Sequence, residues 1–151
     1  MPDTPEARAA NPAGSVLGFD FGTRLIGVAV GSRLSGAQAL TTVNHREAPD
    51  WQRLDALIGE WRPACLVVGL PLSIDGSEQA MSRAARDFAG LLEQRYGLDV
   101  RMVDERLTTN EASRRFAALR ASGSAKRKHA ATIDAIAAQV ILENWLASTD
   151  A

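Results

Sequence analysis

The sequence predicts an α/β domain in which a mixed sheet of five strands is flanked by about four helices. Two patterns indicate this class. Up to residue 44, three strand-like runs follow one another through short turns, as in an antiparallel meander. From residue 51, helical and strand-like segments alternate, which implies two parallel strands added through right-handed crossovers. A chain of 151 residues is long enough for one such domain with a real core.

The antiparallel part of the predicted sheet lies near the start of the chain. Residues 16–22 and 25–31 are apolar runs joined through the turn "GTRL", and a third run at 39–44 follows the turn "RLSGAQ". The preceding residues "MPDTPEARAANPAG" combine proline, alanine and charges without an apolar core, so we expect residues 1–14 to form a flexible tail. The predicted domain therefore spans residues 15–148.

The alternating part is predicted from apolar residues at helical spacing and from residues that start or stop a helix. Pro63 and Gly97 are stop signals, Ser77 is a candidate N-cap, and Thr108 and Glu111 have the spacing of a capping box. The expected elements are a helix over 51–61, a strand over 64–70, a helix from about 81 to Gly97, a strand over 99–105, a helix after Thr108 and a final helix over about 129–145. The core stripe expected for the final helix comprises Ile133, Ile136, Ala137, Val140 and Ile141.

Composition excludes several classes of protein. Hydrophobic residues make up 46% and charged residues 23%, which is typical of globular domains and argues against disorder. The longest apolar run, from Cys65 to Leu72, is much shorter than the roughly 20 residues that span a bilayer, so no membrane partner is expected. Cys65 is the single cysteine, and its strand-like setting predicts an inert thiol in a reducing, cytoplasmic environment.

Charge is unevenly distributed along the chain. The net charge is −1, yet the segment from Arg106 to Lys128 contains seven basic residues and a single acidic one, Glu111. Such a block is typical of an interaction surface, and it is equally compatible with a solvated helix face followed by a basic loop.

Acidic residues stand out at three places in the chain. Asp20 lies inside the apolar, glycine-rich run "GFDFGTRLIGVAVG", Asp104 and Glu105 end the last predicted strand, and Asp134 lies at the margin of the final helix's stripe. The predicted topology brings all of them to one edge of the sheet. Each has a structural alternative, since Asp20 could cap a turn and Asp134 could favour a helix start. Strand alternation says only that Asp104 and Glu105 face opposite sides.

Carboxylates that converge repel one another unless their pKa values shift or cations lie between them. Oxygen-only ligands indicate Mg²⁺ or Mn²⁺. Two such ions about 4 Å apart are the usual device for phosphodiester hydrolysis, in which one activates water and the other stabilises the leaving oxygen. The acidic positions therefore point to cleavage of a nucleic acid.

Four motifs carry a resemblance to a known family. "GFDFGTRLIGVAVG", "LVVGLPLSIDGS", "VDERLTT" and "KRKHAATIDAIAAQVILENWL" occur in this order within residues 15–147. In these motifs the chain resembles the YqgF/RuvX family of pre-16S rRNA nucleases, which are ribonuclease H-like and related to Holliday junction resolvases. The resemblance implies a ribonuclease H-like sheet, catalytic and metal-binding acids at Asp20, Glu105 and Asp134, and trimming of the 5′ end of the 16S rRNA precursor in the cytoplasm.

Several polar residues are candidates for substrate binding. Arg24 follows the first strand and is expected to reach a phosphate or to pair with Asp20. Ser73 would meet a phosphate together with backbone amides at the start of the next helix, whereas Asp75 is not expected to ligate a metal. Contacts to the phosphate backbone are expected from Arg106, Lys126, Arg127 and Lys128.

The function predicted is metal-dependent cleavage of structured RNA. One alternative is a Holliday junction resolvase that cuts branched DNA, which needs a symmetric dimer. Another is a non-catalytic RNA-binding module. The run "DFGTRLIGVAV" also resembles the first phosphate loop of the actin, sugar-kinase and chaperone ATPases, but those proteins use two such domains around the nucleotide. The expected partner is pre-rRNA, with branched DNA as the alternative, and the expected state is a monomer or a weak homodimer.

Overall fold

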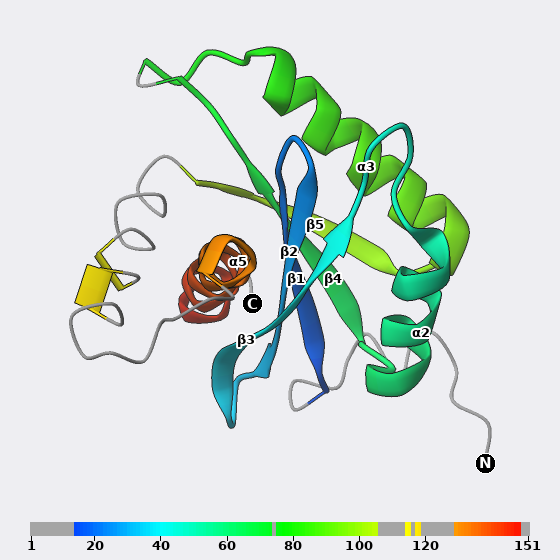
Figure 1. Ribbon diagram of the computed structural model, residues 1–151. Helices are drawn as coiled ribbons and strands as arrows, with labels where there is room; N and C mark the ends of the chain where they lie inside the picture. Colours follow the sequence, from blue (N-terminus) through cyan, green and yellow to red (C-terminus); the bar gives the residue numbers. More distant parts are fainter. Residues whose placement is uncertain (1–13, 74, 106–113, 116, 119–128, 149–151) are drawn as a thin grey trace.

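The computed structural model describes residues 14–73, 75–105, 114–115, 117–118 and 129–148. The expected tail, apart from residue 14, and the basic loop at 120–128 lie outside these ranges. The elements, in chain order, are β1 (Val16–Phe21), β2 (Leu25–Ser32), β3 (Gly36–Asn44), α2 (Trp51–Trp61), β4 (Cys65–Leu70), α3 (Ala80–Tyr96), β5 (Asp99–Asp104) and α5 (His129–Ala147) (Figure 1).

The sheet has five strands in the order β3-β2-β1-β4-β5. The pairs β1–β2 and β2–β3 are antiparallel, whereas β1–β4 and β4–β5 are parallel. The mixed sheet predicted from the order of elements is therefore confirmed. Of the four expected helices, three are described in full, and the segment expected to hold the other is described only at 114–115 and 117–118, which are helical.

The third strand is longer than predicted. It begins at Gly36 rather than at residue 39, because the chain reverses over a shorter turn. The hydroxyls of Ser32 and Ser35 lie 2.9 Å apart within this turn, and pairing resumes at Gly36, whose φ of +74° suits glycine. The register with β2 shifts between Val28 and Ala29, which marks a β-bulge.

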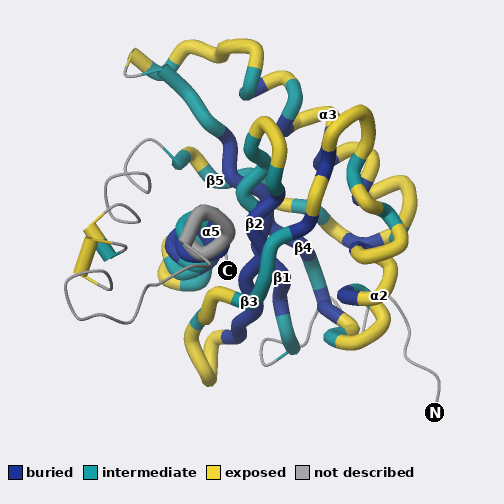
Figure 2. The backbone as a smooth tube through the Cα atoms, in the orientation of Figure 1, coloured by how far each residue is buried: buried dark blue, intermediate teal, exposed yellow. Residues whose placement is uncertain are grey.

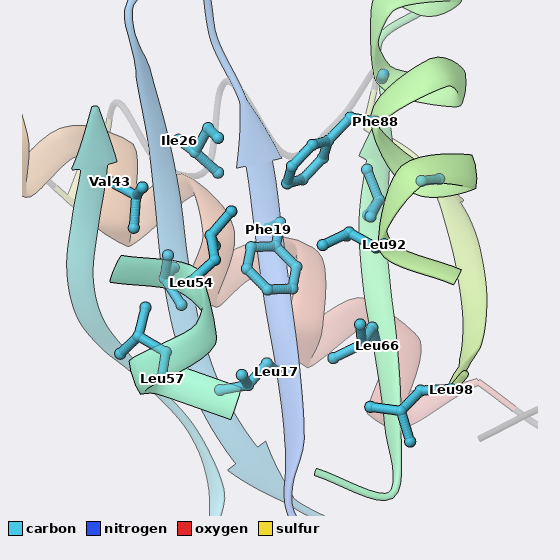
Figure 3. Close-up of a cluster of buried hydrophobic side chains, with 14 of the residues drawn as sticks. Leu17, Phe19, Ile26, Val43, Leu54, Leu57, Leu66, Phe88, Leu92 and Leu98 are labelled. Atoms are coloured by element: carbon cyan, nitrogen blue, oxygen red, sulfur yellow. The ribbon is translucent and has the colours of Figure 1, made fainter. Parts of the chain in front are cut away.

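Helices cover both faces of the sheet, and each face has its own core (Figure 1). Figure 2 shows that the central strands are the most deeply buried part of the chain. Because side chains alternate along a strand, Leu17 and Phe19 of β1 face α2 and α3, whereas Val16 faces α5. The larger core, on the side of α2 and α3, includes Leu17, Phe19, Ile26, Val43, Leu54, Leu57, Leu66, Phe88, Leu92 and Leu98 (Figure 3).

The ends of α2 and α3 show which capping signals operate. Asp50 accepts a hydrogen bond from the backbone N–H of Arg53, and α2 ends at Trp61 with Arg62 as its C-cap, before Pro63. The cap of α3 differs from the prediction: the N-cap is Gln79, in a capping box with Ser82, and not Ser77. Ser77 is instead engaged by the side chain of Asp75, as described below. No helix among the described residues is long and apolar enough to cross a membrane.

The row of α5 that faces the sheet differs partly from the expected stripe. Ala138, Ile141 and Leu142 pack against the sheet, whereas Ile136 and Val140 form a separate buried cluster. This helix is apolar on more than one side, so periodicity alone does not determine which side contacts the sheet. The three tryptophans are partly buried against the two larger cores.

Candidate active site

Asp20 lies on the face of the sheet that α5 covers, between two glycines on neighbouring strands. It directly opposes Gly27 of β2. On the other side, the parallel register pairs Phe19 with Val68, so the next residue along β4, Gly69, lies beside Asp20. The row Gly27, Asp20 and Gly69 therefore leaves room on both sides of the Asp20 carboxylate.

The backbone of α5 occupies the room over Gly27. A Cβ at this position would collide with the carbonyl oxygen of Asp134. Further along the helix, a Cβ on Gly18 would lie 3.0 Å from the Cβ of Leu142. These glycines let α5 pack with its backbone almost on the strands, and they bring Asp134 over the strand partner of Asp20.

The side chain of Glu105 occupies the room over Gly69. A Cβ on Gly69 would collide with Glu105 Oε2 and with Ile141. The backbone N–H of Glu105 donates to the carbonyl of Leu70 over 3.1 Å, which continues the β4–β5 ladder by one residue. Val103 packs in the core beneath α5, so alternation places Glu105 on the same face and the exposed Asp104 on the other.

Electrostatics show that these acids share one environment. Burial raises the pKa of Asp20 to about 6, and the negative charge of Asp134 adds to this shift. Burial also raises the pKa of Glu105 to about 8, with further contributions from Asp20 and then Asp104. The pKa of Asp134 is raised by burial. The cost of holding these charges together would be relieved by protons or by bound cations.

The acids of this site and the resemblance noted in the sequence both imply a divalent cation. Within the described ranges, no three His, Cys, Asp or Glu side chains lie in an arrangement that could hold a metal ion. Asp20, Glu105 and Asp134 suit such an ion in chemistry rather than in their present arrangement: all are half-buried oxygen donors, and Asp20 interacts electrostatically with both of the others. Carboxylate oxygens are the ligands preferred by Mg²⁺ and Mn²⁺.

The structure separates the two readings of Arg24. Arg24 is exposed in the turn between β1 and β2, and it forms no ion pair with Asp20. The raised pKa of Asp20 agrees with this, since a nearby guanidinium would lower it. Pairing with Asp20 is therefore not the role that the structure gives Arg24.

Ser73 and Asp75 lie in a turn that follows β4 at the carboxyl edge of the sheet. The N–H of Ser73 donates to the carbonyl of Ser77 over 2.9 Å, and the N–H of Gly76 donates to the carbonyl of Ser73 over 2.8 Å. Asp75 accepts from both the N–H and the hydroxyl of Ser77, at 2.9 and 2.7 Å. These bonds give Asp75 a structural role, while Ser73 is half-buried in the same turn.

The basic candidates Arg106, Lys126, Arg127 and Lys128 lie outside the described residues. Arg115, from the same basic segment, forms an ion pair with Glu143 of α5 at 2.7 Å. This residue therefore contributes to packing on α5 as well as to the charge of the segment.

Two features of the site do not appear among the sequence candidates. One is the set of glycines Gly18, Gly27 and Gly69, which could have been found by noting that they fall on one face of three predicted strands. The other is His45, a buried histidine after β3 whose Nε2 hydrogen-bonds to the carbonyl of Gly22. No local sequence signal reveals that contact, which joins residues 23 positions apart.

The chain is similar to a known family and to known folds. The family whose model matches residues 14–148 is described as RuvX, Holliday junction resolvase. A protein from Xanthomonas axonopodis pv. citri, named "Putative pre-16S rRNA nuclease", is 50% identical over 97% of this chain and 96% of its own length. A protein of the same name from Xanthomonas campestris pv. campestris is 49% identical over the same shares.

Two solved structures share the fold. RuvC of T. thermophilus in complex with a Holliday junction substrate has a TM-score of 0.51 and 17% identity, covering 85% of this chain and 91% of RuvC. The yeast mitochondrial Holliday junction resolvase Ydc2 has a TM-score of 0.51 and 11% identity, covering 94% of this chain and 82% of Ydc2. At these identities the likeness confirms the ribonuclease H-like architecture.

Proposed function

The chain belongs to the RuvX family, and on that premise we propose that it is a nuclease that hydrolyses phosphodiester bonds in structured RNA. The proposed substrate is the 16S rRNA precursor, cut at its 5′ end in the cytoplasm, and the names of relatives about half identical to this chain support it. The observation that carries the proposal is the approach of Glu105 and Asp134, from distant parts of the sequence, to Asp20 at one edge of the sheet.

Asp20, Glu105 and Asp134 are the residues that would hold Mg²⁺ or Mn²⁺. When bound, divalent cations supply a more acidic attacking water and neutralise charge on the leaving oxygen. The chain's own contribution is to hold three carboxylates in a half-buried place where their charges are costly without a counter-ion. The two-metal form of this mechanism is part of the proposal.

The remaining candidates would bind and orient the RNA. Arg24 would contact a phosphate beside Asp20, and Ser73 would contact one from the turn after β4. We propose that Arg106, Lys126, Arg127 and Lys128 contribute phosphate contacts, which position a nucleic acid without reading its sequence. None of these residues needs to take a proton from the attacking water, because a bound divalent cation would make that water more acidic.

The decisive experiment compares Asp20→Asn with the unchanged protein. With Mg²⁺ or Mn²⁺ and an end-labelled pre-16S rRNA fragment, the variant should lose cleavage, while thermal unfolding and RNA binding change little. Asp87→Asn is the matched control, since Asp87 is an exposed acid of α3 on the opposite face. Cleavage by Asp20→Asn at the normal rate would refute the proposed site, and RNA binding without any metal-dependent product would indicate a binding module.

A second function, resolution of branched DNA, is favoured by the description of the matching family as a Holliday junction resolvase. Two opposed strands must be cut in such a reaction, so a symmetric dimer is required. A four-way DNA junction assayed in parallel, with the oligomeric state measured at the same concentration, distinguishes the two substrates. We expect a monomer or weak homodimer and faster cleavage of the RNA.

A further inference from the structure

The turn between β1 and β2 is held in place by a buried histidine. His45 follows β3 directly, and only 8% of its surface is exposed. Its backbone N–H donates to the carbonyl of Arg24 over 2.9 Å, and its Nε2–H donates to the carbonyl of Gly22. A carbonyl oxygen only accepts hydrogen bonds, so this contact requires a proton on Nε2. A single residue therefore binds both ends of the three-residue turn 22–24.

The imidazole ring of His45 is itself supported by aromatic contacts. It stacks on Phe21 with ring centres 4.5 Å apart and an interplanar angle of 23°. Phe21 in turn stacks on Phe88 of α3 at 4.8 Å, and Phe88 meets Phe19 edge-on at 5.8 Å. Figure 3 shows Phe88 and Phe19 close together between α3 and the sheet. The turn is thus connected through a series of rings to the main core.

The residues that His45 holds are the neighbours of the candidate active site. Asp20 lies two positions before Gly22, and Arg24 leaves the turn toward solvent. The N–H of Gly22 donates to the carbonyl of Leu25 over 3.0 Å, and a Cβ on Gly22 would lie 2.8 Å from that oxygen. The turn is closed by its own backbone hydrogen bond and is held in addition by the two hydrogen bonds from His45. Small changes at His45 would therefore move both Asp20 and Arg24.

We propose that His45 is a positioning residue for phosphodiester cleavage, which sets the places of Asp20 and Arg24 relative to the scissile phosphate by holding the carbonyls of Gly22 and Arg24. The proposal rests on the nuclease function proposed above. His45 does not contact the substrate in this role but acts through the turn. A displacement of about 1 Å in a reacting group can lower a rate about a hundredfold, so such a role is measurable.

Two substitutions separate the hydrogen bond from the ring. His45→Phe keeps a ring that can stack on Phe21 but removes the donor to Gly22, whereas His45→Gln keeps an N–H donor at a similar reach and removes the ring. Tyr96→Phe is the control, because it deletes a 2.7 Å hydrogen bond between the end of α3 and Asp55 of α2, which does not involve the turn 22–24. Each protein is assayed for single-turnover cleavage of the pre-16S rRNA fragment with Mn²⁺, for RNA affinity, and for amide hydrogen exchange at residues 21–25.

We expect His45→Phe to lower the cleavage rate constant by about 10- to 100-fold, with faster exchange at the turn. His45→Gln should recover most of this loss, and Tyr96→Phe should match the unchanged protein. Arg24→Ala should lower the cleavage rate constant by a smaller factor in the His45→Phe protein than in the unchanged protein, because both substitutions act through the same turn. If His45→Phe does not fold, Phe21→Leu replaces it, since that change removes the ring that supports the imidazole, and the same loss is expected.

Normal cleavage by folded His45→Phe would overturn the positioning role, as would an equal loss in His45→Gln while exchange at the turn stays slow. An unchanged protein that cleaves neither RNA nor branched DNA with Mg²⁺ or Mn²⁺ would overturn the proposed function itself. In that case faster amide hydrogen exchange at residues 21–25 in His45→Phe would show that His45 only stabilises the turn. The two failures are therefore distinguishable.

Discussion

The carbonyl oxygen of Asp134 occupies the space over Gly27 that a β-carbon would need. Gly27 is the strand partner of Asp20, so this contact places an acid of the last helix beside the acid of the first strand. The glycine is needed here for close approach of two backbones and not for an unusual φ angle. The position of Asp134 therefore depends on how closely α5 packs on the sheet.

We predict that Gly27→Ala destabilises the protein by about 1–3 kcal/mol, because the added methyl group meets backbone that cannot rotate away. Cleavage should fall as well, since α5 would move Asp134 away from Asp20. Urea denaturation and single-turnover cleavage measure the two effects. Gly90→Ala is the control: Gly90 lies within α3 with open space around its Cβ position, so this change should stabilise the protein by about 0.5–1 kcal/mol. Equal stability of the two variants would contradict the close approach.

The free energy of unfolding should depend on pH when metal is removed with EDTA. The pKa of Glu105 is raised from 4.5 to about 8 and that of Asp20 from 3.8 to about 6, so the folded protein binds these protons more tightly than the unfolded chain. Their stabilising contribution is complete below the unfolded values and is lost as pH rises through the folded values. Stability should therefore fall from about pH 4.5 to 8, by at most about 1.4 kcal/mol per pH unit for each proton released.

Glu105→Gln isolates the larger of these two contributions. The amide cannot ionise, so this variant should be more stable than the unchanged protein at pH 8 and should show a shallower pH dependence above pH 6. Chemical denaturation in EDTA at several pH values gives both quantities. Asp87→Asn, on the exposed side of α3, is measured alongside as the control for replacing an acid by its amide. Parallel profiles for Glu105→Gln and the unchanged protein would argue against a buried, protonated Glu105.

Much of the fold follows from patterns that are local in the sequence. Alternation of strand and helix after residue 51 predicts the parallel strands, and turn residues predict the antiparallel ones. The cap of α3 shows the limit of such signals. Asp75 binds Ser77 in a turn, so the helix starts later, at a box formed by Gln79 and Ser82. Competition between neighbouring side chains for the same backbone groups is not visible in residue preferences.

The site is predictable to the extent that its acids lie at positions fixed by topology. Asp20 is conspicuous because a charge in an apolar run requires a partner, and the carboxyl ends of parallel strands meet at one edge. The side of the sheet that Glu105 faces follows only once Val103 is seen beneath α5. The contact of His45 with Gly22 depends on how β3 lies beside the β1–β2 turn, which no local pattern specifies.

We predict that Arg24→Ala weakens RNA binding and lowers its salt dependence by about one counter-ion, with a slope change of about 0.7–0.9 in log Kd against log salt concentration. Arg24 forms no ion pair with any residue that the structure describes, so its charge is available to a phosphate. Binding titrations at several salt concentrations measure the slope. Arg33→Ala is the matched control, because Arg33 is exposed at the opposite end of β2. An equal change in the salt-dependence slope for both variants would show that Arg24 makes no specific phosphate contact.

Gly69→Ala tests the approach of Glu105 to Asp20 directly. The added Cβ would collide with Glu105 Oε2 and with the δ-methyl group of Ile141, and both are the far ends of side chains that can rotate away. The stability loss should therefore be smaller than for Gly27→Ala, about 1 kcal/mol or less, while cleavage falls about 10- to 100-fold because the carboxylate is displaced. Gly59→Ala, in the open surface of α2, should leave cleavage unchanged. Normal cleavage by Gly69→Ala would mean that the carboxylate of Glu105 acts from a place other than the one over Gly69.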